Sequence, residues 1–174
     1  MSVALIIGGS EQVKNEHGRA LALCGNLRVT HFLVNDQIAL WDATEAEGVT
    51  LHPPKLPGWL NTRTAAGLPP LRAVWSIHAA PGVDCVTSEW RGSSGLFAVK
   101  VAMECGFRRI VLCGVPMEPG AGHVVRHRSW PEARTFHRGW QSHRALIAPV
   151  ARSCSGWTQR LLGDVTAEWL RSRD

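Results

Sequence analysis

Short apolar runs alternate along the chain with segments whose apolar residues recur at helical spacing. Two of the runs, residues 3–7 and 110–113, are apolar throughout, as is typical of strands buried on both faces, and two further strands are expected at 29–34 and 72–77. Two segments, residues 11–24 and 96–105, place their apolar residues on one helical face, and residues 57–66 are also expected to form a helix, which Gly67 ends. This alternation predicts a single Rossmann-like domain over residues 1–174, with a three-layer α/β/α fold and a mainly parallel sheet.

Weaker patterns fill the remaining parts of the chain. A short surface helix within 37–48, a third strand at 49–52 and an edge strand near 83–86 complete the first half. From about residue 116 we expect a basic loop, a helix over 131–147 and a last strand at 150–154. Two short terminal helices should follow, at 158–162 and 167–171.

The most informative stretch is GSSGLFAVKVAMECGFRRIVLCGV, residues 92–115. Its first four residues carry no bulky side chain, so the backbone there can approach a ligand closely. Ser93 or Ser94 is placed to cap the helix that follows. A helix that begins at Ser94 and Gly95 offers free amides and the positive end of a dipole, which suit a phosphate. Gly114 ends the strand after this helix.

Two other loops follow strands and carry small or polar residues. Gly8, Gly9 and Ser10 come after the first strand, and Ser10 can cap the next helix. The turn lacks the GxGxxG and Gly-Lys-Ser/Thr patterns, so it is either a phosphate turn or the tight turn that any α/β domain needs. Asn35 and Asp36 follow the second strand, where they either bind a ribose or base or close the strand as an Asx turn.

These segments resemble two related families. The Ser-Ser-Gly turn, the following strand with Ile110, Leu112, Gly114 and Val115, and the ends of the first two strands carry the resemblance. They are similar to the bacterial lipooligosaccharide sialyltransferases (glycosyltransferase family 42) and to Rossmann-like domains that include the archaeal 6-hydroxymethylpterin pyrophosphokinases. In the sialyltransferases these loops hold the CMP part of a sugar nucleotide. The resemblance therefore implies nucleotide-binding residues at Gly8, Gly9, Ser10, Asn35, Asp36, Ser93, Ser94, Gly95 and Gly114. This chain is shorter than those enzymes, and it has no Tyr, although they use tyrosines around the donor phosphate.

Residues 123–138 carry the groups best suited to chemistry. In the sialyltransferases a histidine of this region is the general base on the acceptor hydroxyl, and His123 and His127 are the matching positions here. We expect Arg126 and Arg128 to pair with phosphate. The spacing of the two histidines could also suit a metal, but no acidic or Cys third ligand is near, so we expect no metal site. The alternative for the whole segment is a solvated basic surface.

Composition limits the partners and the cellular location that we expect. The net charge of +5 comes almost wholly from arginine, and it attracts phosphates without specifying nucleic acid. The chain has no run of about eighteen apolar residues, so no membrane span is expected, and no basic N-terminal segment that would indicate a signal peptide. Five cysteines without a CxxC pair favour reduced buried thiols and a cytoplasmic location.

Three classes of function fit this sequence. The first is a transferase that uses a CMP- or UDP-sugar and a histidine base; the second is a nucleotide-binding module without chemistry. The third is a phage- or nucleic-acid-associated basic protein whose DNA binding would depend steeply on salt.

No Gly-x-Ser-x-Gly elbow is present, so Ser93 and Ser94 are interpreted as ligand-binding hydroxyls. Trp90 and Trp130 flank these loops, where each either packs in the core or stacks on a base or sugar. We expect a nucleotide- or sugar-nucleotide-binding domain, with transfer as the leading hypothesis and no cofactor or oligomeric state specified.

Overall fold

The computed structural model describes residues 2–125 and 130–172. Their seven strands form one sheet in the order β5-β4-β3-β2-β1-β6-β7, and every neighbouring pair is parallel. The strands are β1 (Ser2–Ile7), β2 (Arg28–Val34), β3 (Ala46–Val49), β4 (Val74–Ser76), β5 (Cys85–Val86), β6 (Ile110–Cys113) and β7 (Ala151–Ser153). The predicted α/β class and its parallel sheet are therefore confirmed.

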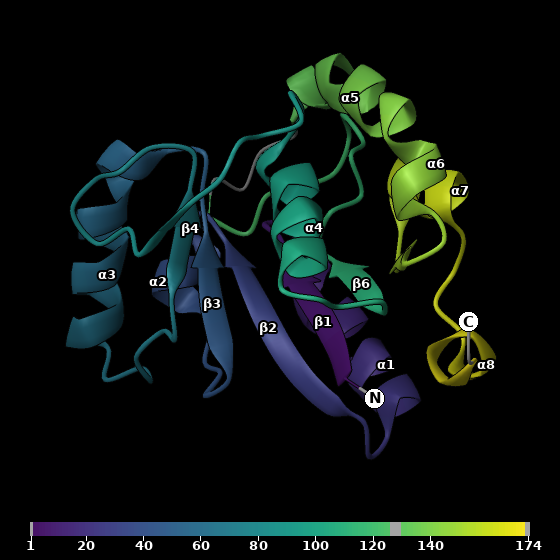
Figure 1. Ribbon diagram of the computed structural model, residues 1–174, viewed down its shortest axis with the longest axis horizontal. Helices are drawn as coiled ribbons and strands as arrows, with labels where there is room; N and C mark the ends of the chain where they lie inside the picture. The colour runs from purple at the N-terminus through teal and green to yellow at the C-terminus, as the bar shows by residue number, and fades with distance from the viewer. Residues whose placement is uncertain (1, 126–129, 173–174) are drawn as a thin grey trace.

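Helices cover both faces of the sheet (Figure 1). They are α1 (Val13–Cys24), α2 (Gln37–Leu40), α3 (Leu56–Ala65), α4 (Ser94–Glu104), α5 (His137–Ser142), α6 (Arg144–Ile147), α7 (Gly156–Leu162) and α8 (Ala167–Arg171). Two 3₁₀ turns, η1 (Pro53–Lys55) and η2 (Pro131–Phe136), precede α3 and α5. One face packs on α4 with α5, α6 and α7 at its side, and the other packs on α1, α2, α3 and α8. No helix of the described residues is long and apolar enough to cross a membrane.

The continuous apolar strands supply two cores at once. In β1, Ala4 and Ile6 point into the core beneath α4, while Val3, Leu5 and Ile7 point into the core beneath α1, and all five are fully buried. Successive side chains of a strand face opposite sides of a sheet, so a strand covered on both sides must be apolar throughout.

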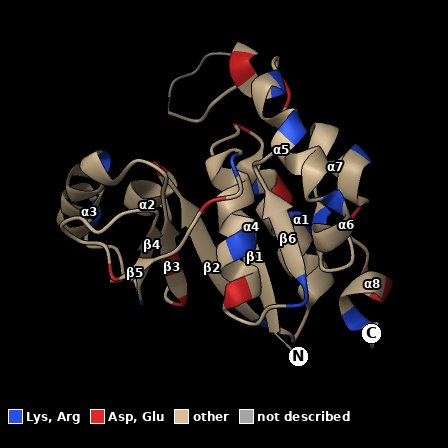
Figure 2. Ribbon diagram, turned by 45° about the horizontal axis from the view of Figure 1, so that its top comes forward, with Lys and Arg blue, Asp and Glu red and all other residues tan. Residues whose placement is uncertain are grey.

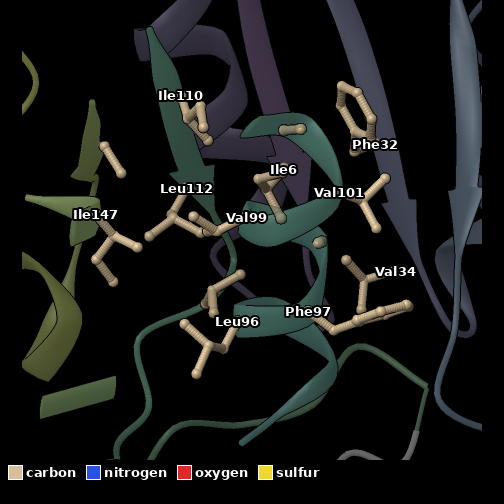
Figure 3. Close-up of a cluster of buried hydrophobic side chains, with 14 of the residues drawn as sticks. Ile6, Phe32, Val34, Leu96, Phe97, Val99, Val101, Ile110, Leu112 and Ile147 are labelled. Carbon is tan, nitrogen blue, oxygen red and sulfur yellow. The ribbon is translucent and has the colours of Figure 1, made fainter. Parts of the chain in front are cut away.

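Helix α4 lies across the middle of the sheet and is the most buried helix of the fold. Its residues 95–102 are all buried, and Figure 3 shows Phe97 beside Val34 and Val101 on the side of Phe32, two residues of β2. Lys100 is the charged residue in this run; its Nζ donates to Thr87 Oγ1 (2.8 Å) and pairs with Glu104, which satisfies the buried ammonium.

The path of the chain reverses beside β1. Strands β1 to β5 step outward to one edge of the sheet, and α4 then returns over the opposite face, so that β6 pairs with the free side of β1. In open parallel sheets, ligands bind outside the carboxyl ends of the strands at such a point of reversal. The loops after β1 and β6 are therefore the first place to look for a site.

Two boundaries differ from those expected near the N-terminus. Helix α1 begins at Val13 rather than residue 11, and Ser10 is not its N-cap: the Ser10 hydroxyl accepts from the Gln12 amide (3.3 Å) before the helix starts. The third strand covers 46–49 instead of 49–52. The predicted boundary is wrong because Glu47 is buried within β3, where its Oε2 accepts from Trp75 Nε1 (2.6 Å).

The helix expected over 131–147 is divided into η2, α5 and α6. At the break between α5 and α6, His143 Nδ1 bonds to the Gly139 carbonyl (2.9 Å). In an uninterrupted helix that carbonyl would accept from the backbone amide of residue 143. The side chain therefore replaces a helical hydrogen bond, which the apolar spacing alone does not reveal.

Candidate functional site

A cavity of about 750 Å³ lies at the carboxyl ends of β1, β2, β3 and β6, beside the first turn of α4. It brings together residues singled out from separate parts of the sequence: Gly8, Gly9, Ser10, Asn35, Asp36, Ser93, Ser94, Gly95, Gly114 and His123 all line it. The other three candidates, Arg126, His127 and Arg128, lie outside the described residues.

Gly8 and Gly114 let the ends of β1 and β6 meet closely. A Cβ on Gly8 would lie 2.3 Å from the Gly114 carbonyl oxygen. Gly114 has a φ of +72°, and a Cβ there would lie 2.9 Å from the Gly8 carbonyl oxygen and 2.8 Å from Val13 Cβ. Its amide donates to Glu16 Oε2 (2.6 Å), a carboxylate buried under α1. Contact between the two backbones is thus sufficient reason for glycine at both positions.

The turn after β1 is covered by residues 122–124, which we call the covering segment. The Glu11 amide donates to the Gly122 carbonyl (3.1 Å), and the Val124 amide donates to the Gly9 carbonyl (2.8 Å). The His123 ring packs on Gly9, where a Cβ would lie 2.4 Å from its Nε2. Because these contacts use the polar groups of the turn, they favour the tight-turn interpretation over the phosphate-turn one.

The first turn of α4 is the best placed anion site of the cavity. Ser93 is the cap, and its Oγ accepts from the Leu96 amide (3.3 Å) and from the buried Trp140 Nε1 (3.1 Å). The amides of Ser94 and Gly95 donate to no other described residue. Amides at a helix N-terminus lack an intrahelical acceptor, so these two can bind an anion in the cavity.

Asn35 connects β2 and β3 to this turn. Its Nδ2 donates to Ser94 Oγ (3.1 Å), and its Oδ1 accepts from Thr50 Oγ1 (2.9 Å). Its φ of +53° is a conformation that Asn adopts more readily than most residues, and it directs the side chain across the cavity. The second N–H of the amide and the second lone pair of its oxygen can still bind a ligand.

Asp36 lies between α3 and the covering segment. Its Oδ1 accepts from Trp59 Nε1 (2.9 Å), and its Oδ2 is 3.8 Å from His123 Nε2. The other ring nitrogen, His123 Nδ1, accepts from the Val125 amide (3.2 Å). That contact requires a lone pair on Nδ1, so the proton of the neutral ring is on Nε2 and faces Asp36.

Several lining residues were missed from the sequence. Lys55 and Trp59 line the cavity from the start of α3, and Met117 and Phe136 line it beyond β6. Lys55 follows the third strand closely in the sequence, and this position could have identified it as a lining residue. The loops at the carboxyl ends of parallel strands gather at one edge of the sheet. Trp59 lies within the helix expected over 57–66, and nothing in the sequence singles it out for the site.

The two flanking tryptophans have different positions. Trp130 lines the cavity and lies near Phe136, with ring centroids 5.4 Å apart. Trp90 instead stacks on His143, with centroids 4.6 Å apart and planes at 7°. Of the two, only Trp130 is placed to contact a ligand in the cavity.

Backbone strain gathers around the same loops. Among the described residues, the non-glycine residues with positive φ are Asn35 (53°), Arg91 (50°) and Met117 (53°). Asn35 and Met117 line the cavity, and Arg91 immediately precedes its lining residue Gly92. Such strain is concentrated at functional sites in many proteins. In the described part of the chain, no group of three or more His, Cys, Asp or Glu side chains is arranged to hold a metal ion.

The fold and the cavity together define a parallel α/β domain with a cavity, lined by both polar and apolar groups, at the carboxyl edge of its sheet. Comparison with protein-family models, curated proteins and solved structures finds no match to this chain.

Proposed function

We propose that the cavity binds a nucleotide or a sugar nucleotide. The observation that carries this proposal is the pair of amides at Ser94 and Gly95, which donate to no other described residue and face a cavity at the reversal point of a parallel sheet. A phosphate placed there would receive two backbone hydrogen bonds and the favourable end of the α4 dipole. The volume of about 750 Å³ lies within the range of small-molecule sites.

Other lining groups suit the rest of such a ligand. Asn35 keeps one amide N–H and one lone pair for a base or a ribose hydroxyl. Trp130 offers an aromatic face to a ring of the ligand. Among the described residues, lysines and arginines are not gathered on one element: in Figure 2 the blue segments, which mark both residue types, are spread over α4, α5, α6 and α8. This distribution gives less support to a nucleic-acid partner, which would favour a continuous basic patch.

For the reaction, we propose transfer of the sugar from a CMP- or UDP-sugar to an acceptor hydroxyl. The acceptor oxygen would bond to the anomeric carbon while its proton passes to His123, and the bond from that carbon to the phosphate oxygen would break. The leaving nucleotide would carry the electron pair, and its charge would lie against the α4 amides. Asp36, 3.8 Å from His123 Nε2, would stabilise the imidazolium that forms.

One observation favours the second candidate, a binding module without chemistry. His123 Nδ1 already accepts from the Val125 amide, so it can take a proton only if that hydrogen bond opens. A binding module would need no such change.

The test begins with thermal unfolding of the purified protein in the presence of single ligands. The panel contains CMP, CDP, UDP, GDP, their sugar conjugates, NAD and a short DNA duplex. A ligand at about one hundred times its dissociation constant stabilises the folded state by roughly 2.7 kcal/mol, which is readily measured. Ser94→Ala should reduce the shift, whereas Thr62→Ala, a hydroxyl on the exposed side of α3, should not. No shift with any nucleotide would overturn the proposal, and a shift with DNA alone would indicate a nucleic-acid partner.

Turnover separates the two candidates. In a donor-consumption assay, His123→Gln should lower kcat by about 10²-fold or more and leave nucleotide affinity nearly unchanged, because a general base acts on the acceptor. A wild-type protein that binds the nucleotide but consumes no sugar donor with any acceptor is a binding module.

A further inference from the structure

One end of the cavity carries a lysine and the opposite end carries two glutamates. Lys55 lies at the end formed by the loop after β3 and the first turn of α3, and in the described part of the chain no other Lys or Arg lines the cavity. Glu118 and Glu132 lie at the opposite end, beyond β6. The Arg160 guanidinium bonds to Glu118 (2.6 Å) but does not line the cavity.

The ammonium of Lys55 is available to a ligand. Lys55 is exposed, and no carboxylate of the described residues forms an ion pair with it. The first turn of α3 holds no acidic residue that would neutralise it. Trp59, one helical turn later, lines the same cavity, so Lys55 and Trp59 present one side of α3 to the ligand.

The carboxylate that contacts Trp59 is already engaged. Asp36 accepts from Trp59 through Oδ1 and faces His123 through Oδ2. His52, on the loop that leads to Lys55, also lines the cavity. An ammonium in a partly enclosed cavity, without a carboxylate partner, attracts anions more strongly than one on an open surface.

We propose that Lys55 selects ligands that carry a second anionic group beyond the phosphate held at the α4 amides. This inference rests on the proposed function, because it assigns one phosphate to Ser94 and Gly95. The second group is either the next phosphate of a nucleoside diphosphate or a carboxylate on the attached sugar, since both are oxyanions that an ammonium binds. Lys55 then distinguishes ligands by charge, while Asn35 and the α4 amides contact the part they share.

The test measures dissociation constants by titration calorimetry without divalent cations, for the wild type, Lys55→Gln and a control, Lys14→Gln. Lys14 is exposed on α1 and does not line the cavity, so its replacement removes one charge elsewhere. The first pair of probes, UMP against UDP and CMP against CDP, tests a second phosphate. The second pair, UDP-glucose against UDP-glucuronate, tests a sugar carboxylate.

We expect Lys55→Gln to weaken the more anionic member of at least one pair about three- to fivefold relative to its partner. Lys14→Gln should change neither ratio. The pair that responds identifies the anion: the second phosphate or the carboxylate. Equal weakening of both members of every pair, or no weakening, overturns the role of Lys55 while leaving nucleotide binding intact. Failure of the wild type to bind any nucleotide, in this titration and in the thermal-unfolding panel, overturns the proposed function, and the inference with it.

Discussion

Ser93→Ala tests whether the N-terminus of α4 is fixed by its serine cap. Ser93 is 6% exposed, and its hydroxyl accepts two hydrogen bonds, from the Leu96 amide (3.3 Å) and from Trp140 Nε1 (3.1 Å). Loss of a cap costs about 1 kcal/mol. The buried indole N–H would also lose its acceptor, at about 1–3 kcal/mol. We therefore expect Ser93→Ala to lower the free energy of unfolding by about 2–4 kcal/mol.

Urea denaturation followed by tryptophan fluorescence measures this loss, and a double-mutant cycle with Trp140→Phe isolates its larger part. Phenylalanine has no N–H to satisfy, so in that background Ser93→Ala should cost only the cap, about 1 kcal/mol. Ser94→Ala is the matched control. Its hydroxyl is half-buried and accepts from Asn35 Nδ2, so about 0.5–1 kcal/mol is expected. If Ser93→Ala costs the same in the wild-type and Trp140→Phe backgrounds, or less than about 0.5 kcal/mol in both, the reasoning is wrong.

Three further predictions concern the close approach of β1 and β6, the amide of Asn35 and a half-buried histidine. Gly8→Ala should lower the free energy of unfolding by about 2 kcal/mol, because its Cβ would lie 2.3 Å from the Gly114 oxygen; an unchanged urea midpoint would contradict this. Asn35→Gly removes the side chain that bonds to the α4 turn, and glycine tolerates the φ of +53° at this position. Nucleotide affinity measured by calorimetry should therefore fall about tenfold. Unchanged affinity would show that Asn35 does not contact the ligand. Burial, together with the His17 charge, lowers the pKa of His31 to about 4. The unfolded chain then binds more protons between about pH 6.5 and 4, so stability should fall as pH drops through this range, by roughly 1–2 kcal/mol at about pH 5 after allowing for partial exposure. His31→Gln should flatten that profile in urea denaturation at several pH values, and an equally steep profile would exclude His31 as its source.

Strands β1 and β6 and the long central helix were predictable because one local signal determined each of them. A strand covered on both faces has to be apolar throughout, as β1 and β6 are, and α4 has a serine before it and a continuous apolar surface. The rule that carboxyl ends of parallel strands share an edge then placed Asn35 and Gly114 near Ser94 without any distance being known.

The errors have a common cause in contacts between distant segments. In the sequence, Glu47 suggests a polar position outside any strand. In the structure it lies inside β3, where its carboxylate accepts a hydrogen bond from Trp75 Nε1 of β4. The turn after β1 could be open to a phosphate by its sequence, yet the covering segment, more than 100 positions later, bonds to its polar groups. Lys55 and Trp59 join the site because α3 begins beside Asp36. Local patterns cannot identify such partners, since each depends on how the whole sheet is assembled.

The pairing of β1 with β6 also sets the order in which the cavity can form. Ile7 pairs with Cys113, so about 100 residues of chain must be made and brought into a loop before the two strands meet. Contacts so far apart in sequence slow folding. During synthesis, β1, β2 and β3 can associate while α4 and β6 are still missing. A ligand that needs the α4 amides therefore recognises only the finished sheet, and its binding would stabilise the chain after the last central strand has been inserted.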